Sequence, residues 1–262
     1  MEMLVKTLAG LEEVLAREIT DLGGQDVEVQ TRAVTCQGDR ELLYRLNLWL
    51  RTGLRVLVPI HQAQISNEQE LYDSVREIDW GQYLTPDHTL AVDANTQSAQ
   101  LDHSHFLALK TKDAVCDWFR DRTGRRPSVD TRHPHLRIHL HLDSLNHMTV
   151  LLDSSGDGLH RRGYRDQGGG APLNEVLAAG LVLLSGWERD TPFVDFMCGS
   201  GTILIEAASY AYHLPPGRNR RFGFERWLDH DREAWQTIKH LAKDQERAFP
   251  HAIVGNDRDF RA

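Results

Sequence analysis

The chain of 262 residues has few cysteines, no long apolar run and no excess of basic residues. Its three cysteines, Cys36, Cys116 and Cys198, are far apart and form no Cys-x-x-Cys pair, so neither a disulfide framework nor a zinc ribbon is indicated. The apolar runs fall short of the roughly 18 residues that a membrane helix needs, and the N-terminus lacks the pattern of a signal peptide. These absences predict reduced thiols, no membrane partner and a cytoplasmic location.

The net charge of −8 argues against nucleic-acid binding over the whole surface, because such binding requires many Lys and Arg side chains opposite phosphates. Local basic clusters remain as candidates. There are three of them: Arg120, Arg122, Arg125 and Arg126; Arg161, Arg162 and Arg165; and Arg218, Arg220 and Arg221. Each cluster taken alone is equally typical of a solvated basic turn.

The first sixty or so residues predict the order βαββαβ. Apolar side chains recur at helical spacing in two segments, and short β-type segments flank them. The expected strands are 3–8, 27–30, 33–36 and 55–60, and the expected helices are 10–22 and 39–50. This order is that of the ferredoxin-like split unit.

A second group of elements is expected between residues 67 and 153: helices over 68–78 and 104–122, and strands over 90–94, 136–142 and 148–152. Apolar residues alternate with Arg137, His139 and His141 in one of these strands, so one face is buried and the other wet. The two histidines suit a metal less well than a solvent-facing or RNA-facing pair, because no third ligand is assured nearby. We therefore expect no metal.

The polar turn 154–158 marks the clearest boundary. After it we expect a helix that opens at Pro172, strands over 193–196 and 252–255, and helices over 202–212 and 231–247. The predicted domains are therefore 1–62, 63–154 and 155–262.

The most informative segment runs from Phe193 to Thr202: a buried strand, the acid Asp195, a glycine-rich turn and a helix start. Such a turn lets backbone N–H groups approach an anionic or zwitterionic ligand. No Lys-Ser or Lys-Thr pair follows the glycines, and Leu204 stands where the dinucleotide fingerprint has its third glycine. A Walker loop and an NAD site are both disfavoured.

A second acid, Asp257, follows the next expected strand. A carboxylate in that position is placed to accept hydrogen bonds from ribose hydroxyls. Asp195 is placed to orient the turn or to meet a ligand ammonium group. The alternative for both acids is an ordinary loop-cap carboxylate. Cys198 has no evident His partner, which favours a packing role over nucleophilic catalysis.

Two stretches together resemble the THUMP-domain RNA guanine-N2 methyltransferases, and most closely the N-terminal half of the bifunctional K/L enzymes of that family. The first is Asp195-Phe196-Met197-Cys198-Gly199-Ser200-Gly201-Thr202 with Ile205-Glu206-Ala207-Ala208. The second is His160 to Arg165 with Ala171-Pro172-Leu173-Asn174-Glu175.

The resemblance implies an α+β and α/β chain with a ferredoxin-like domain, a THUMP domain and the start of a class I (Rossmann-like) methyltransferase domain. It implies S-adenosyl-L-methionine as cofactor and the exocyclic N2 of a guanine in 23S ribosomal RNA, free or in a large-subunit assembly intermediate, as target. The implied cofactor residues are Asp195, Cys198, Gly199, Ser200, Gly201, Thr202 and Asp257. Candidate RNA contacts are Arg161, Arg162, Tyr164, Arg165, Arg125 and Arg126, although salt bridges within a domain junction explain the arginines of the 160–165 stretch nearly as well.

The sequence departs from the family at one point, because the Asn-Pro-Pro-Tyr motif beside the target base is absent from residues 1–262. We expect that motif beyond Ala262, which leaves the catalytic residues unknown and the fragment inactive on its own. Three alternatives stay open: a transfer-RNA methyltransferase, a THUMP adaptor without catalysis, and a dinucleotide-dependent oxidoreductase.

Overall fold

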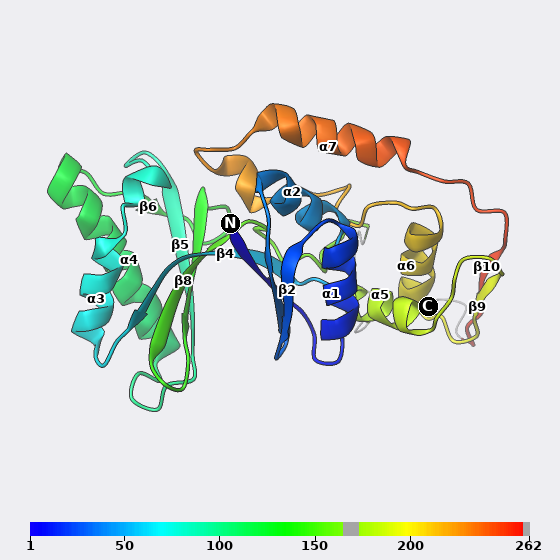
Figure 1. Cartoon of the computed structure of the whole chain (residues 1–262), viewed down its shortest axis with the longest axis horizontal. Coiled ribbons are helices and arrows are strands. Elements are labelled where there is room, and N and C mark those ends of the chain that lie inside the picture. Colours follow the sequence, from blue (N-terminus) through cyan, green and yellow to red (C-terminus); the bar gives the residue numbers. More distant parts are fainter. Residues whose placement is uncertain (165–172, 259–262) are drawn as a thin grey trace. The chain divides into compact units, whose positions relative to one another are not determined.

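A computed structural model describes residues 1–164 and 173–258 of the chain, which divide into two compact units (Figure 1). Unit 1 contains Met1–Val56 and the described residues of 157–221 and 231–258. Unit 2 contains Leu57–Gly156 and Phe222–His230. Unit 1 thus combines elements from both ends of the chain.

The N-terminal part of unit 1 is a small antiparallel sheet with two helices. Strand β3 pairs with both β1 and β2, and the strand order is β2-β3-β1-β4. This is the predicted ferredoxin-like arrangement. The helices bury Leu15, Ile19, Leu42 and Leu46 against the sheet. The elements are β1 (Glu2–Lys6), α1 (Glu12–Asp21), β2 (Gln25–Gln30), β3 (Ala33–Gln37), α2 (Arg40–Trp49) and β4 (Arg55–Gln64), of which only the first two residues of β4 belong to unit 1.

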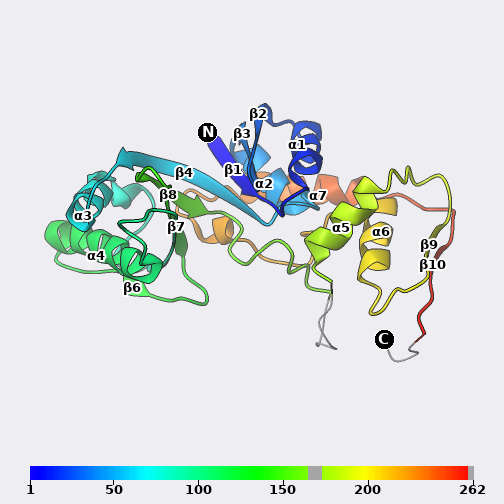
Figure 2. The ribbon, with the colours of Figure 1, turned by 90° about the horizontal axis from the view of Figure 1, so that it is seen from below.

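The C-terminal part of unit 1 has a parallel two-stranded sheet in its described residues. Strands β9 and β10 pair in register, and helix α6 follows β9 directly, which is the start of a Rossmann-like fold. Helix α5 lies beside α6 in both views (Figures 1 and 2). The elements are α5 (Glu175–Leu184), β9 (Phe193–Asp195), α6 (Thr202–Ala211), α7 (Arg232–Asp244) and β10 (Ile253–Gly255).

Helix α5 packs directly on the segment that leads into α1. A Cβ atom at Gly180 would lie 2.6 Å from Leu11 Cδ2, closer than real Cβ contacts come. The glycine therefore permits a close approach between the two parts of unit 1.

Unit 2 is a mixed sheet of order β4-β8-β7-β5-β6 with helices α3 and α4 on one face (Figure 2). Strand β5 runs parallel to β7 and β6, and β8 runs antiparallel to β7 and β4. Alternate residues of β7 are buried, as predicted. The elements are α3 (Glu68–Glu77), the 3-10 helix η1 (Trp80–Gln82), β5 (Thr89–Thr96), α4 (Ser104–Thr123), β6 (Ser128–Val129), β7 (Leu136–Leu142), β8 (His147–Asp153) and the 3-10 helix η2 (Gly223–Arg226).

Strand β4 runs four positions past its predicted end at Ile60. Its register against β8 shifts between Pro59 and His61. Proline has no N–H to donate to the neighbouring strand. The shift in register at Pro59 allows β4 to pair with β8 again from His61 onward.

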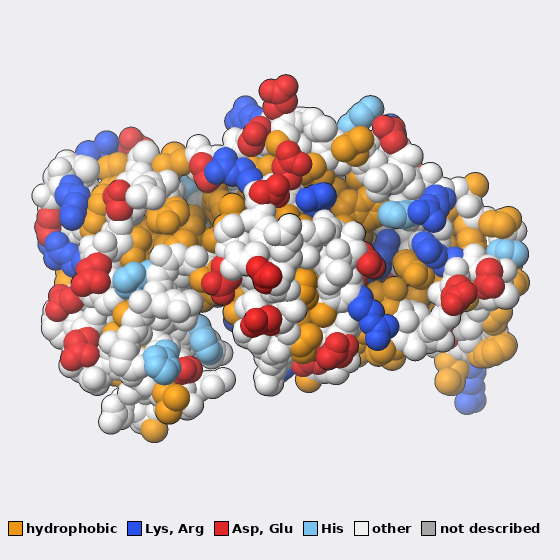
Figure 3. Space-filling model, in the orientation of Figure 1, with side chains coloured by type: hydrophobic (Ala, Val, Ile, Leu, Met, Phe, Trp, Pro, Cys, Tyr) orange, Lys and Arg blue, Asp and Glu red, His pale blue; other side chains and the backbone are white. Residues whose placement is uncertain are grey.

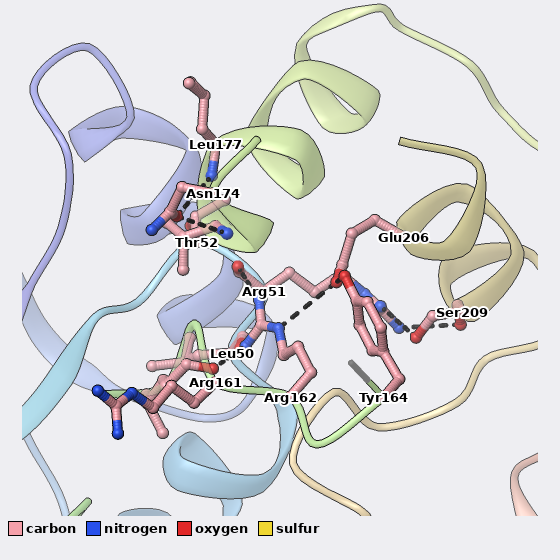
Figure 4. A network of polar contacts seen from close by, with 12 residues as sticks. Leu50, Arg51, Thr52, Arg161, Arg162, Tyr164, Asn174, Leu177, Glu206 and Ser209 are labelled. Atoms are coloured by element: carbon pink, nitrogen blue, oxygen red, sulfur yellow. Dashed lines mark hydrogen bonds and ion pairs between the residues drawn. The ribbon is translucent and has the colours of Figure 1, made fainter. Parts of the chain in front are cut away.

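A buried polar network joins the two parts of unit 1 (Figure 4). Arg162 is 3% exposed and donates from Nη1 to the carbonyls of Leu50 and Leu159, at 3.3 and 2.8 Å, and from Nη2 to the carbonyl of Arg51. Its Nε lies 3.6 Å from Oε1 of Glu206, a residue of α6 that is 2% exposed.

Arg51 extends this network to the C-terminal end of α6. Its guanidinium donates to Ser209 Oγ at 3.0 Å and to the carbonyls of Ser209 and Leu214 at 3.2 and 2.8 Å. On the opposite side, Glu18 of α1 accepts from the N–H groups of Arg51 and Thr52, at 2.8 and 2.9 Å, and from Thr52 Oγ1. Burial lowers the pKa of Arg51 to about 10, so its guanidinium is still charged at neutral pH.

Removal of one partner of a buried charge pair leaves the other without compensation. We therefore expect Arg162→Ala to lower the free energy of unfolding of unit 1 by about 3 to 5 kcal/mol, measured by urea denaturation with circular dichroism. The neighbouring Arg161 is the matched control, because its side chain is 69% exposed and its contact with Asp157 is long, at 3.8 Å. Arg161→Ala should stay within about 0.5 kcal/mol of wild type, and equal losses in both variants would contradict the role assigned to the network.

Candidate functional site

The turn between β9 and α6 requires glycine at two positions. Gly199 and Gly201 have φ values of +49° and +77°, in the left-handed region that L side chains rarely adopt. A Cβ atom at either position would meet nothing within 4 Å. The turn is closed by the N–H of Gly201, which donates to the carbonyl of Cys198 at 2.8 Å. Open space therefore lies beside a backbone that only glycine holds easily.

Asp195, at the end of β9, has one oxygen engaged and one without a partner. Its Oδ1 accepts from the N–H of Met197 at 3.1 Å, and its backbone carbonyl accepts from Asn256. Its Oδ2 is buried, with no hydrogen-bond partner among the described residues. The first contact orients the turn, and the second oxygen is placed to accept from a donor on a ligand.

Asp257 lies against the same turn. Its Oδ2 accepts from the N–H of Gly199 at 2.8 Å, and the carbonyl of the preceding Asn256 accepts from the N–H of Cys198. The fold thus brings together two acids that are far apart in the sequence, at the carboxyl ends of two parallel strands. Ligands of open α/β sheets bind at this edge.

The turn differs from the prediction in how its N–H groups are used. Those of Cys198, Gly199 and Gly201 all donate within the described part of the chain. They hold the turn in shape, and the acceptor Asp195 Oδ2 is the buried polar atom left for a ligand. A ligand that carries an ammonium group fits this arrangement better than one that offers only anionic oxygens.

The other turn residues have distinct environments. Cys198 is half-buried, and its Sγ would be 2.9 Å from a Cβ atom at Gly255 on β10, in keeping with the predicted packing role. Thr202 is buried at the start of α6, whereas Ser200 is exposed. All seven predicted cofactor residues therefore lie at this edge: six between the last residue of β9 and the first of α6, and Asp257 in the loop after β10.

The predicted RNA contacts in unit 1 divide into exposed and buried side chains. Arg161 is exposed. Arg162 is buried, and Tyr164 donates its hydroxyl to Glu206 Oε1 at 2.9 Å. These contacts argue against an RNA-facing role for Arg162 and Tyr164, since both hold the buried network. Arg165 lies outside the described residues.

The predicted RNA contacts in unit 2 are exposed but paired. Arg125 contacts Asp87, and Arg126 lies 3.2 Å from Asp117. These pairs are surface salt bridges, which exchange partners at little cost in free energy. Both arginines remain candidates for phosphate contacts.

His139 lies 3.1 Å from Asp153 Oδ2, so this ring is held by a carboxylate. Within residues 1–164 and 173–258, no group of three His, Cys, Asp or Glu side chains is arranged to hold a metal ion. In the same residues no helix has the length and apolar character needed to cross a membrane.

Sequence reasoning missed Arg51 and Glu18. The guanidinium of Arg51 contacts Ser209, which is 158 positions away in the chain. No local pattern predicts a partner at that separation, and Arg51 stands outside the three arginine clusters.

Three family models match successive parts of the chain. Residues 2–57 match the RlmL ferredoxin-like domain, residues 66–151 the THUMP domain, and residues 162–262 the RMKL-like methyltransferase domain.

Two curated relatives cover nearly the whole chain. Slr0064 of Synechocystis sp. (strain ATCC 27184 / PCC 6803 / Kazusa), named as an RNA methyltransferase, is 43% identical over 95% of this chain and 65% of its own length. Ribosomal RNA large subunit methyltransferase K/L of Syntrophotalea carbinolica is 42% identical over 97% of this chain and 36% of its own length. The chain therefore spans less than two thirds of either relative.

The crystal structure of SMU.472, described as a methyltransferase complexed with SAH, superposes with a TM-score of 0.90 at 31% identity, over 99% of this chain and 69% of that one. The three matched regions follow one another along the chain in the order ferredoxin-like, THUMP and methyltransferase. Over nearly its whole length the chain is similar to proteins named as RNA methyltransferases, one of them of the K/L type, and it contains regions that match the RlmL ferredoxin-like domain, the THUMP domain and the RMKL-like methyltransferase domain.

Proposed function

We propose that the protein that contains this chain uses S-adenosylmethionine to methylate the exocyclic N2 of a guanine in 23S ribosomal RNA. The observation that carries the proposal is the open glycine turn flanked by two acids, one with an unpartnered buried oxygen, in a chain that also has a THUMP domain. The similarity to a K/L enzyme over 97% of the chain supports the choice of ribosomal RNA, and the SAH in SMU.472 supports the choice of cofactor.

The described residues fit this cofactor in charge and shape. Asp195 Oδ2 would accept from the ammonium group of the methionine part, and the Asp257 carboxylate would accept from the ribose hydroxyls. Gly199 and Gly201 keep the space beside the turn open. When bound, the cofactor supplies a methyl group on a positively charged sulfur.

The remaining domains would present the RNA. Structured RNA is recognised mainly by its shape and by contacts to phosphates and 2′-hydroxyls. Arg125, Arg126 and Arg161 are exposed and so are available for such contacts. Correct placement of the guanine amine against the methyl group would supply much of the rate enhancement.

Cofactor binding is tested with Asp195→Asn. The amide keeps an oxygen that can hold the Met197 N–H but removes the charge and one acceptor. We expect SAH affinity, measured by isothermal titration calorimetry, to fall by about tenfold or more, because a hydrogen bond to a charged group contributes about 1.5 to 3 kcal/mol. Asp190→Asn is the control, because that carboxylate is exposed and outside the turn. Equal SAH affinity in the wild type and both variants would contradict the assignment.

The reaction is tested with the full-length protein that contains this chain. Large-subunit ribosomal RNA, transfer RNA and small-subunit ribosomal RNA are incubated separately with labelled S-adenosylmethionine, and the digested nucleosides are identified by mass spectrometry. We expect N2-methylguanosine from the large-subunit RNA alone. Methylated transfer RNA or N6-methyladenosine would contradict the target, and RNA binding without transfer would favour the adaptor.

A further inference from the structure

A groove of about 760 Å³ lies in unit 1 at the C-terminal end of α6, one helix length away from the glycine turn. Since α6 has 10 residues, that length is about 15 Å. Its walls come from α1, α2, the end of α5 and the end of α6. The lining includes Arg17, Arg45, Trp49, Arg51, Tyr210 and His213.

Aromatic rings and guanidinium groups lie close together at the α6 end of the groove. The Arg189 guanidinium lies 4.3 Å from the centre of the Tyr210 ring, and that of Arg51 lies 5.5 Å from it. The rings of Trp49 and His213 meet edge to face at 4.7 Å. Flat aromatic and guanidinium surfaces of this kind are those on which unpaired bases stack.

Several cations lack acidic partners in the described part of the chain: Arg45 lines the groove, and Arg189 and Arg247 lie close to its lining residues Tyr210 and His213. Among the described residues, Arg45, Arg189 and Arg247 form no ion pair, and both Arg45 Nε and His213 Nδ1 are buried without a hydrogen-bond partner. By contrast, Arg76 and Arg120 in unit 2 each contact an aspartate. Figure 3 shows Lys or Arg side chains gathered with histidine over the region of α1 and α6.

Three acids and three arginines line the groove, and the acids are confined to one wall. Glu13, Glu18 and Asp21 line the α1 wall. Glu18 is already engaged by the backbone of Arg51 and by Thr52. On the opposite wall, burial together with the charges of Arg247, Arg51 and Arg189 lowers the pKa of His213, so positive charge is concentrated there.

Two residues here have a left-handed backbone: His213 lines the groove, and Arg189 lies over the lining residue Tyr210. Arg189 and His213 have φ values of +65° and +53°, which side chains other than glycine seldom adopt. Residues with such a strained backbone are found more often at ligand-binding sites, where the surrounding structure holds them in that conformation.

We propose that this groove binds a single-stranded segment of the RNA substrate, with phosphates on Arg45 and Arg189 and unpaired bases against Tyr210 and Trp49. The inference rests on the proposed function, which makes RNA the substrate. Single-stranded RNA fits better than a duplex because its bases expose their faces, and better than an acidic peptide because the groove combines rings with cations.

The test uses fluorescence anisotropy of the chain with a labelled single-stranded RNA and with a duplex of the same sequence. We expect Arg45→Ala and Arg189→Ala each to weaken single-strand binding by about tenfold, with duplex binding within about twofold of wild type. In the double variant the slope of log affinity against log salt should fall by about 1.4, since each phosphate contact on a single strand contributes about 0.7. Arg232→Ala, an exposed arginine of α7 outside the groove, should leave both affinities unchanged.

Ultraviolet cross-linking of the single strand to the wild-type chain gives a readout that does not depend on a variant's folding. Cross-links on peptides with Trp49 or Tyr210 are expected. Cross-links confined to unit 2, unchanged affinity in both arginine variants, or displacement by poly-glutamate as effective as that by unlabelled RNA would overturn the proposal.

The SAH titration distinguishes a failure of the groove proposal from a failure of the proposed function. A chain that binds SAH but not single-stranded RNA has no such groove site, while its proposed function stands. A chain that binds neither SAH nor any RNA contradicts both.

Discussion

The contact of Arg162 with Glu206 is the constraint on which the arrangement of unit 1 depends. Both groups are buried, so neither charge is compensated by solvent, and each needs the other in place. Because Glu206 is on α6, the pair fixes this helix against the segment that ends the ferredoxin-like part. The N-terminal end of α6 carries the glycine turn and its C-terminal end borders the groove. One buried pair therefore sets the position of both candidate sites.

The turn shows how a small loop is kept in shape without filling the space beside it. Its N–H groups are satisfied by the carbonyls of Cys198 and Asn256 and by the carboxylate of Asp257, so no bulky side chain is needed to brace it. Because no side chain braces the turn, the space beside Gly199 and Gly201 stays open, and one oxygen of Asp195 has no hydrogen-bond partner among the described residues. An unpaired buried acceptor costs free energy, and a donor on a bound ligand would recover that cost.

Local patterns in the sequence predict most of the fold. Asp39, Asn67 and Asn174 each accept from the first N–H groups of a helix, and apolar spacing identifies what those helices bury. The pairing of β9 with β10 brings Asp195 and Asp257 together as the motif indicates. What the sequence does not reveal is which arginine of a cluster is buried. Arg161 and Arg162 are neighbours of identical chemistry, and only contacts with Leu50 and Glu206, remote in the sequence, distinguish them.

The distribution of charge ties these features together. A chain with a net charge of −8 repels RNA at long range, so binding must come from places where positive charge is left over. In unit 2 several exposed arginines form ion pairs with aspartates. Each of these arginines must leave its aspartate before it can bind a phosphate. Arg45 in the groove and Arg189 beside it form no ion pair among the described residues, so they need no such exchange. In the proposed complex, an acidic surface would disfavour contact with RNA elsewhere, so these few unneutralised sites would direct where a long RNA lies on the protein.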